Sequence, residues 1–554
     1  RIVRRMAMRL TIFAAVVAAL AIGTAAANAR TRASASWSAP IAVTEAAVPA
    51  GRISNLQVAV DESGTAVYLW GESDGVRTRV RTRACTAASC SAAEDLTNGA
   101  NSVTRIALAM AADGTATAVW EYTNPSKISA RVRTGGAWGA ETDVSSVALR
   151  VLQGAAALAN GGLVVLSTAT ANAVTSLGAT SCLQRLTLCT TADISTPANS
   201  ANVPRIATNG ADKGAIAWVE QIGAGNRFVR YAPVTQAGAG APAIGAAAAM
   251  SAETPSTKTR LAVDVDTNGL TTVAWVENNV FEALYVQRFA DSAPPAAPPA
   301  AAVATTTGTI ADDSLHIGSD AKAGSVVTWA TSLNGAQTLS ALPFTALTGG
   351  AQQTVTSDGT ALAPALAVAG TGTGAIAYVR DSQIVASWAA TLAGTWAVAS
   401  PEPLAGTTAS QPAIGSARDG TVVLAWVTAS QATGEQQIRS SRLAVTPTAA
   451  ASTLRVVRRA RVTWTVSTRV TSTIGGTLRQ VGRITVRGKR VVACRTPVRP
   501  IVAGTTTTFT CRLTRAATTQ RRRTPLRIQL TTSLTGADGT KATKQISVRL
   551  PRKR

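Results

Sequence analysis

Apolar and polar positions along this chain recur as one pattern about every 50 residues. Each copy has an apolar segment, an Asp/Asn/Gly turn, a second apolar segment ending in an aromatic residue, a polar loop and a third segment. Two clear copies are "AVDESGTAVYLWGE" (59–72) and "AMAADGTATAVWEY" (109–122). Short apolar runs between turn residues predict strands, and a period of this length is typical of a propeller or a solenoid.

The residue that ends the second segment aligns eight copies, of which the third is degenerate. These residues are Trp70, Trp120, Thr168, Trp218, Trp275, Trp329, Tyr378 and Trp426. The first two segments of each copy are apolar almost without alternation, which favours strands buried on both faces between neighbouring sheets, as in propeller blades. We therefore expect the aromatic side chains to pack between sheets, with sugar stacking as the alternative.

The two ends of the repeated region complement each other. The segment "SWSAPIAVTE" (36–45) resembles the fourth strand of other copies, whereas the eighth copy ends near 447 without a fourth strand. We expect the strand around Trp37 to pair with the third strand of the last copy, around 439–445. The sequence thus predicts an all-β fold, with an eight-bladed β-propeller closed by an N-terminal strand, or seven blades if the weak third copy forms none.

Over about residues 36–447 these copies resemble secreted bacterial β-propeller repeat proteins. The resemblance is one of architecture. Sialidase-type propellers carry a turn of the form S-x-D-x-G-x-x-W, and "DESGTAVYLW" (61–70) has a different spacing. No sialidase residue is therefore transferred to this chain.

A different pattern begins after residue 450. Segments such as "RVTWTVSTRV" (461–470) and "TFTCRLTR" (508–515) alternate apolar residues with Arg and Thr. This alternation predicts a small β-sandwich of immunoglobulin-like style over 451–554.

The N-terminal residues have the pattern of a secretory signal. Four arginines precede an apolar stretch, "LTIFAAVVAALAIG" (10–23), and the small residues "ANA" (27–29) follow it. We expect a signal peptide over 1–29, a propeller over 30–450, and a secreted or cell-wall-associated protein without a membrane span after cleavage. A retained anchor helix is the alternative, although the apolar stretch is short for one.

Six cysteines fit an exported protein and fall into three close pairs. The expected disulfides are Cys85–Cys90, Cys182–Cys189 and Cys494–Cys511. A zinc site is the alternative, but the chain has a single histidine, His316.

Charge is divided unevenly along the chain. Of 53 Lys and Arg residues and 29 acidic residues, 24 and one respectively lie after residue 450, so most of the net charge of +24 belongs to the last segment. The candidate anion-binding residues are Arg521, Arg522, Arg523, Arg552, Lys553 and Arg554. We expect them to associate with an anionic cell-envelope polymer, the alternative being a merely solvated surface. The segment is poor in aromatic residues, so no specific nucleic-acid binding is expected.

Acidic residues recur just after the aromatic position. They are Glu72, Glu121, Glu220, Glu277 and Asp381. We expect them in loops between the second and third strands, on one face of the propeller, where they would contact a ligand. Ordinary solvated loop carboxylates are the alternative.

The stretch "DVDTNG" (264–269) matches the start of a calcium loop, which makes Asp264, Asp266 and Asn268 weak calcium candidates. The twelfth position of such a loop needs a bidentate Glu and is Trp275 here. The stretch also occupies the ordinary turn of the repeat. No cofactor is expected.

These features favour an exported, monomeric, non-catalytic binding or adhesion protein. Its propeller would present a ligand face to an extracellular glycan, and its basic segment would associate with the cell envelope. The alternative is a secreted carbohydrate-active hydrolase or lyase, which would need two carboxylates about 5–10 Å apart. No Ser/His/Asp motif surrounds His316.

Overall fold

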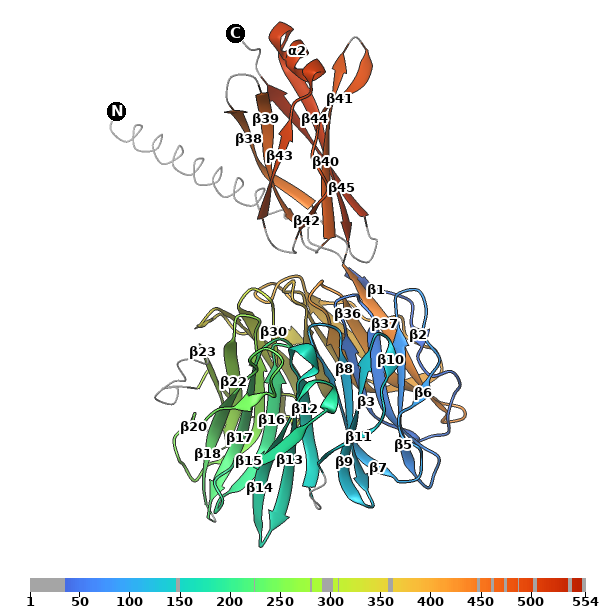
Figure 1. Ribbon diagram of the computed structural model, residues 1–554, viewed down its shortest axis with the longest axis vertical. Helices are drawn as coiled ribbons and strands as arrows, with labels where there is room; N and C mark the ends of the chain where they lie inside the picture. Colours follow the sequence, from blue (N-terminus) through green and yellow to red (C-terminus); the bar gives the residue numbers. More distant parts are fainter. Residues whose placement is uncertain are drawn as a thin grey trace, which may run out of the picture.

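The computed structural model is all-β (Figure 1), and helical structure among its described residues is limited to one α-helix and two 3-10 turns. The structure describes residues 35–145, 150–223, 225–278, 281–290, 302–306, 308–356, 362–445, 449–459, 463–472, 476–486, 488–501, 506–536 and 541–550. The expected signal peptide and the last four residues, with the anion-binding candidates Arg552, Lys553 and Arg554, lie outside these ranges.

Eight antiparallel sheets are formed before residue 446, one for each copy of the repeat, and we call them together the sheet array. Sheet 1 contains β3 (Ile53–Val60), β4 (Ala66–Ser73), β5 (Thr78–Cys85) and β6 (Glu94–Asp95). Sheet 2 contains β7 (Val103–Met110), β8 (Ala116–Thr123), β9 (Ser126–Thr134), β10 (Ala137–Trp138) and β11 (Thr142–Ser145). Sheet 3 contains β12 (Arg150–Ala157), β13 (Leu163–Ala171), β14 (Val174–Cys182) and β15 (Cys189–Asp193). Sheet 4 contains β16 (Ser200–Thr208), β17 (Lys213–Ile222), β18 (Asn226–Thr235), β19 (Ala243–Ile244) and β20 (Ala248–Ala249).

The remaining four sheets follow the same order. Sheet 5 contains β21 (Thr257–Val265), β22 (Leu270–Asn278), β23 (Glu282–Ala290) and β24 (Ala304–Thr306). Sheet 6 contains β25 (Thr309–Ile310), β26 (His316–Ser319), β27 (Gly324–Leu333), β28 (Ala336–Thr345), β29 (Thr348–Gly349) and β30 (Gln353–Thr356). Sheet 7 contains β31 (Leu362–Val368), β32 (Gly374–Arg380), β33 (Gln383–Ala389) and β34 (Ala397–Val398). Sheet 8 contains β35 (Thr407–Ser416), β36 (Val422–Ser430), β37 (Gln436–Val445), β1 (Ala35–Trp37) and β2 (Ile41–Ala42).

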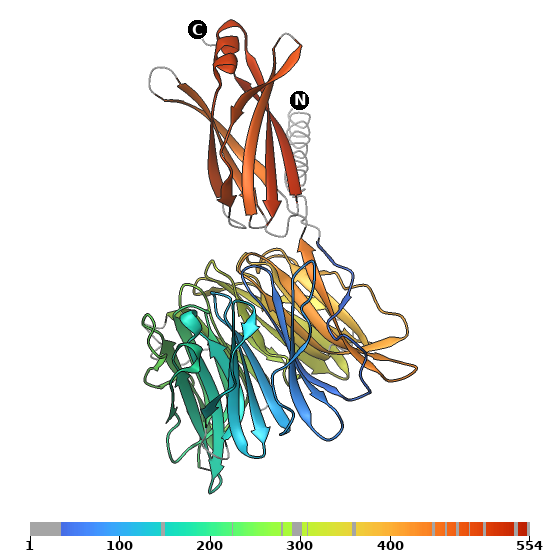
Figure 2. The ribbon, with the colours of Figure 1, turned by 45° about the vertical axis from the view of Figure 1, so that its right-hand side comes forward.

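The N-terminal strands complete the last sheet. Trp37 pairs with Leu443 and Ala42 with Arg439, both antiparallel on β37, which confirms the pairing expected from the sequence. The first strand of each sheet contacts the first strand of the next, and β3 of sheet 1 also contacts β35 of sheet 8. The sheets therefore stand side by side with their first strands innermost (Figures 1 and 2).

A polar side chain fixes the turn between the first and second strands in several sheets. In each case Oδ1 accepts hydrogen bonds from the backbone N–H groups two and four residues later. The residues are Asp61, Asn209, Asp266 and Asp320. This capping explains the Asp or Asn at the end of the first strand in these four sheets.

The aromatic residues of the repeat lie between sheets, as predicted. Those of the seven regular copies are at most 2% exposed. Trp218 of sheet 4 packs with Leu177 of sheet 3, and Trp120 of sheet 2 packs with Leu69 of sheet 1. The degenerate third copy, with Thr168, still forms a complete four-stranded sheet.

Residues 449–550 form two further sheets that face each other across a small core, and we call them the C-terminal sheets. One contains β38 (Ala449–Arg459), β39 (Thr463–Ser472) and β43 (Thr506–Arg512). The other contains β40 (Gly476–Val486), β41 (Lys489–Arg495), β42 (Arg499–Ile501), β44 (Leu526–Gly536) and β45 (Lys541–Leu550). The core includes Val470 from the first sheet and Leu478 and Leu534 from the second.

All three predicted disulfides are present. Cys85–Cys90 and Cys182–Cys189 join neighbouring strands or loops within sheets 1 and 3, and Cys494–Cys511 links β41 to β43 across the two C-terminal sheets. Each therefore stabilises a local arrangement, and the third also holds the two layers together.

The structure corrects the expected position of the "RRR" cluster. These residues end α2 (Arg515–Arg523), a helix that the strand-like pattern did not predict, capped by the Thr514 side chain. Arg521 lies one turn after the buried Ala517, on the same helix face, and is only 5% exposed. Arg521 is therefore part of the packed face, whereas Arg522 is exposed.

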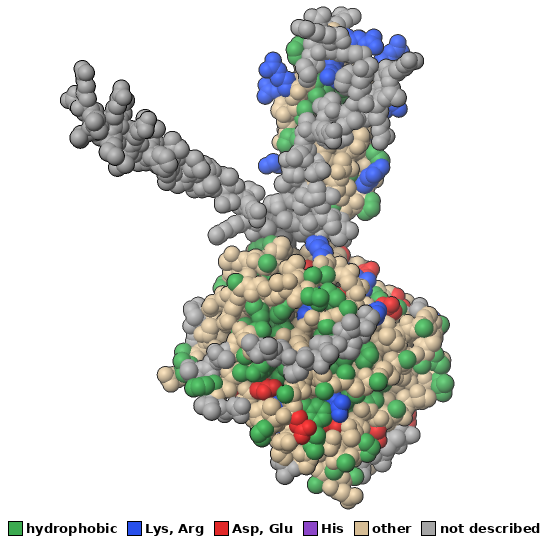
Figure 3. Space-filling view, turned by 90° about the vertical axis from the view of Figure 1, so that its left-hand side faces the viewer, with side chains coloured by type: hydrophobic (Ala, Val, Ile, Leu, Met, Phe, Trp, Pro, Cys, Tyr) green, Lys and Arg blue, Asp and Glu red, His purple; other side chains and the backbone are tan. Residues whose placement is uncertain are grey.

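The C-terminal sheets follow the end of β37, on the side of the array opposite the hairpins that join the second and third strands (Figure 1). Helix α2 lies at the far end of these sheets, so Arg521 and Arg522 do not pack on Glu220 or Glu277. Lys and Arg dominate the charged residues on the visible surface of the C-terminal sheets, whereas apolar and acidic side chains are seen on the array (Figure 3).

Candidate functional site

Four of the five predicted acidic site residues lie in strands, which corrects their expected placement in loops. Glu72, Glu121 and Glu220 occupy the second strands β4, β8 and β17 and are at most 9% exposed. Glu277 occupies β22, and only Asp381 lies in a hairpin turn, where it is exposed. The structure does not bring them together at one site.

The spacing of these glutamates explains their burial. Glu72, Glu220 and Glu277 lie two residues after the aromatic position, so the two side chains point to the same side of the strand. Glu121 directly follows Trp120 and instead accepts a hydrogen bond from the backbone N–H of Leu152 at 2.8 Å. Trp218 Nε1 donates to Glu220 at 3.3 Å, and Arg230 from the neighbouring strand donates to the same carboxylate at 3.2 Å. Burial by itself would raise the pKa of Glu220, but hydrogen bonds from Asn199 and Thr196 and the nearby Arg230 hold the pKa below its ordinary value.

The same arrangement recurs in other sheets. Trp70 Nε1 donates to Glu72 at 3.1 Å, and Trp275 Nε1 donates to Glu277 at 3.0 Å. Arg81 lies 3.1 Å from Glu72. These carboxylates therefore connect the indole ring of their own strand to a basic side chain nearby. A basic residue on a strand next to a Trp-x-Glu motif is the sequence feature that could have predicted this structural role.

The calcium candidate Asp266 has partners within the protein for both of its carboxylate oxygens. Its Oδ1 accepts from the backbone of Asn268 and Leu270, and its Oδ2 accepts from Arg288 Nη2 at 2.6 Å. Both oxygens are therefore used by the turn and the ion pair. Across the described ranges, no group of three His, Cys, Asp or Glu residues is arranged to hold a metal ion.

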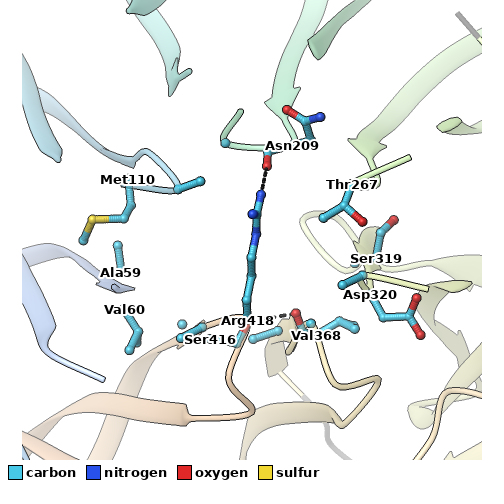
Figure 4. Close-up of a pocket in the computed structure, with 18 of the residues that line it drawn as sticks. Ala59, Val60, Met110, Asn209, Thr267, Ser319, Asp320, Val368, Ser416 and Arg418 are labelled. Carbon is cyan, nitrogen blue, oxygen red and sulfur yellow. Dashed lines mark hydrogen bonds between the residues drawn. The ribbon is translucent and has the colours of Figure 1, made fainter. Parts of the chain in front are cut away.

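A cavity lies at the axis of the array, where the first strands end, and we call it the central chamber. Its volume is about 380 Å³. Seven of the eight sheets contribute to the wall, mainly through small side chains and backbone of the first strands and their turns, and none of the described lining residues is aromatic. Figure 4 shows Thr267, Ser319 and Ser416 among the residues around it.

Arg418 spans the central chamber. It comes from the turn between β35 and β36, and its Nη2 donates to the backbone carbonyl of Asn209 in sheet 4 at 2.9 Å (Figure 4). Its Nη1 lies 3.6 Å from Glu62 of sheet 1. The guanidinium group therefore places a positive charge at the centre of the mouth, between turns from opposite sides of the array.

Backbone hydrogen bonds between turns shape the chamber wall. The N–H of Ala112 in sheet 2 donates to the carbonyl of Gly210 in sheet 4 at 2.8 Å. This hydrogen bond joins the turns of sheets 2 and 4 directly, although sheet 3 lies between them in the chain. Ala159 of sheet 3 donates to Ala211 at 2.6 Å. These bonds explain why sheet 3 does not contribute to the chamber lining.

Carboxylates gather at one side of the chamber. Asp264, Asp266 and Asp320 all interact electrostatically with Arg288, which reaches them from β23. Burial raises the pKa of Asp264 to about 6, although the nearby Ser319 hydroxyl and the Arg288 guanidinium favour the ionised form. Asp264 is thus a chamber residue able to gain or lose a proton near neutral pH.

Replacing Asp264 with Asn should change the pH dependence of stability. Native Asp264 holds its proton up to a pKa of about 6, above the ordinary 3.8, so its contribution to stability is complete below about pH 4 and is lost as the pH rises through 6. The Asp264→Asn variant has no carboxyl group to ionise at this position, so its stability does not fall in this way as the pH rises. We expect it to gain up to about 3 kcal/mol relative to the native chain between pH 4 and pH 8, measured by urea unfolding.

Asp113→Asn provides the control, because Asp113 is an exposed residue of the corresponding turn in sheet 2 and accepts a backbone hydrogen bond that Asn can also accept. Its stability relative to the native chain should vary little with pH. If the unfolding free energy of Asp264→Asn varies with pH in parallel with that of the native chain, the raised pKa of Asp264 is contradicted.

Comparisons with known proteins do not identify a family. No family model matches the sequence, and no curated protein matches it. Among solved structures, polysaccharide lyase Uly1 is similar with 9% identity and a TM-score of 0.41, over 74% of this chain and 99% of the lyase. An α-L-arabinanase from Penicillium chrysogenum has 10% identity and a TM-score of 0.33, over 61% and 92% of the two chains.

Oligopeptidase B from Trypanosoma brucei has 11% identity and a TM-score of 0.41, over 69% of this chain and 54% of the peptidase. TM-scores below 0.5 establish neither a shared fold nor a shared activity for this chain. Within the described ranges, no helix has the length and apolar character needed to span a membrane.

Proposed function

We propose that the sheet array is a closed eight-bladed β-propeller that binds one sugar unit of an extracellular glycan in its central chamber. The contact between β3 and β35 and the pairing of β1 with β37 support closure. The observation that carries the binding proposal is the central chamber itself, because a cavity of about 380 Å³ is within the size range of small-molecule sites.

The chemistry of the chamber suits a polar, hydroxyl-rich ligand. Turn backbone groups, the Ser319 and Thr267 hydroxyls and the Asp264 carboxylate supply hydrogen-bonding groups around a guanidinium from Arg418. The repeat tryptophans are buried between sheets, so recognition here would depend on hydrogen bonds rather than on stacking. In this proposal the chain is an exported, non-catalytic binding or adhesion protein.

A carbohydrate-active hydrolase or lyase is the second candidate. The observation that favours it is Asp264, a chamber carboxyl whose pKa of about 6 suits general acid or base catalysis near neutral pH. The ion-paired Asp266 and the nearby Asp320 would be the other carboxylates of such a site. The carbohydrate-active enzymes among the similar structures are compatible with this candidate, but their TM-scores add no argument for it.

The test is a glycan array probed with the full chain and two tryptophan variants of one turn. Thr267→Trp places a bulky ring in the chamber, whereas Asn268→Trp changes the next residue, which is exposed and does not line it. We expect Thr267→Trp to lose at least about tenfold in affinity, or about 1.4 kcal/mol, and Asn268→Trp to bind as the native chain does. Equal binding by both variants would contradict the chamber as the site.

Catalysis is tested on the glycans that bind. Mass spectrometry after prolonged incubation should find them intact if the chain only binds them. Cleavage that is lost in Asp264→Asn, with binding retained, would favour the enzyme instead.

We also propose that the basic C-terminal sheets associate with an anionic cell-envelope polymer. The support is the charge of 24 basic residues and one acid after residue 450, together with exposed arginines such as Arg522. Each phosphate contact releases counterions, so retention of the full chain on phosphate-rich cell wall should fall steeply between about 50 and 200 mM salt. Retention that does not depend on salt would contradict this proposal.

A further inference from the structure

Two small cavities adjoin each other in the wall formed by the first strands of sheets 4, 5 and 6. Their volumes are about 170 and 200 Å³, and both are lined by Arg205, Leu261, Asp313 and Leu315. We call them together the second cavity. Arg205 lies three residues before Thr208, a lining residue of the central chamber, so the second cavity is further from the turns along the same strands.

Arg205 is a solvent-exposed cation with few contacts to the rest of the protein. Within the described ranges, its guanidinium makes one hydrogen bond, from Nη1 to the neighbouring Pro204 carbonyl at 3.1 Å, and no carboxylate lies within 4.0 Å. By contrast, Arg260 in the same cavity pairs with Glu282 at 2.8 Å and with Asp312 at 2.9 Å. Desolvation lowers the pKa of Arg205, while Asp313 acts in the opposite direction. A guanidinium in this state has donors available for an anion.

The only histidine of the chain lies in the same wall. His316 begins β26 and lines the second cavity, and its Nε2 is shielded from solvent without a hydrogen-bond partner among the described residues. Burial lowers the pKa of His316, Arg205 lowers it further, and Asp313 and the carbonyl groups of Asp313 and Pro364 act in the opposite direction. The imidazole therefore responds to the charge state of this cavity.

The backbone beside the cavity adopts unfavourable conformations. Val203 has φ +50° and Asp313 has φ +55°, in the left-handed region that β-branched residues in particular avoid. Val203 lies where the pairing register of β16 shifts between Asn202 and Arg205. Conformations of this kind cost on the order of 1–3 kcal/mol and cluster at functional sites. Here they lie beside Arg205.

We propose that the second cavity binds a small oxyanion, a carboxylate or a phosphate group, through the guanidinium of Arg205, with His316 as a residue of its wall. A planar guanidinium recognises either group with two parallel hydrogen bonds. The cavity volumes suit one oxyanion-bearing unit, such as a uronate, rather than a longer segment. This site is separate from the ligand proposed for the central chamber.

The unique histidine provides the readout. In the full chain labelled with ¹⁵N-histidine, the imidazole signals of His316 are followed while D-glucuronate, inorganic phosphate or uncharged D-glucose is added. We expect saturable shifts with glucuronate, phosphate or both, and none with glucose. An anion bound to Arg205 offsets the positive charge beside the ring, so the pKa of His316 should also rise on saturation.

The variants test whether Arg205 is the anchor. Arg205→Gln should lose at least about tenfold in affinity for the responding anion, and Arg205→Lys should lose less because it keeps the charge but not the paired hydrogen bonds. Arg133→Gln, which removes an arginine from β9 outside the cavity, should bind as the native chain does.

The responding anion identifies the class: glucuronate alone indicates a carboxylate site, and phosphate alone indicates a phosphate site. If Arg205→Gln fails to fold, as judged by circular dichroism, the reduced affinity of Arg205→Lys carries the test. The absence of a response to both anions, or an equal response in the Arg205 variants, would overturn the proposal.

Discussion

Replacing Arg288 with methionine is expected to lower the free energy of unfolding by about 3–5 kcal/mol. Arg288 and Asp266 form an ion pair at 2.6 Å, and neither side chain is exposed to solvent. Arg288 also donates to the Thr272 hydroxyl at 2.6 Å and, from sheet 5, to the carbonyl groups of Ala346 and Ala323 in sheet 6. Methionine fills similar volume but leaves a buried carboxylate without its cation.

Urea unfolding followed by tryptophan fluorescence measures this effect, because the repeat tryptophans report on the array. Arg79→Met provides the control, since the Arg79–Asp95 pair has a similar length of 3.1 Å but both side chains are more than a third exposed. The control should lose no more than about 1 kcal/mol. If Arg288→Met lowers the free energy of unfolding no more than the control does, a structural role for the buried pair is contradicted.

Deleting residues 35–44 is expected to destabilise the sheet array by about 4–6 kcal/mol and to promote association between chains. The deletion removes the fully buried Val43 and the packing of Trp37 against sheets 7 and 8, each contributing about 2–3 kcal/mol. It also leaves one edge of β37 unpaired, and an exposed edge strand is a template for pairing with another chain.

Complementation distinguishes closure from general loss of stability. A synthetic peptide spanning 35–48 should restore the melting temperature and the monomeric elution of the deleted chain, because its strands can pair with β37 again. The same peptide with Val43→Asp should not, since it places a charge in the core. A deleted chain as stable and as monomeric as the native protein would rule out closure by this strand.

Local sequence chemistry predicted most of the array. The period set by residues such as Trp120 and Trp218 identified the sheets, and burial of those rings confirmed their expected place. The missing fourth strand near 447 correctly assigned a partner to the segment around Trp37. Close spacing was enough to pair the cysteines, because short loops favour local disulfides. These inferences depend on close spacing in the chain or on a pattern repeated along it.

The local sequence pattern did not predict the candidate sites. Glu220 looked like a loop acid, but its position two residues after Trp218 places it in a strand beside Arg230. Arg418 and Asn209 are separated by 209 positions, and only the arrangement of sheets around one axis places them across a single chamber. Nothing in the local pattern around Arg205 distinguishes it from arginines that are paired.

The sequence by itself determined the strand repeat, its turn chemistry, the pairing of the N-terminal strand and the disulfides, because each depends on residues adjacent in the chain or on a pattern repeated along it. Tertiary structure decided which charges are buried and which are paired. Arg288, Arg260 and Arg205 all come from sheets 4 and 5, yet the first two have carboxylate partners and the third has none within ion-pair distance among the described residues. That difference depends on side chains converging from neighbouring sheets, and their separation is fixed only when the sheets pack together.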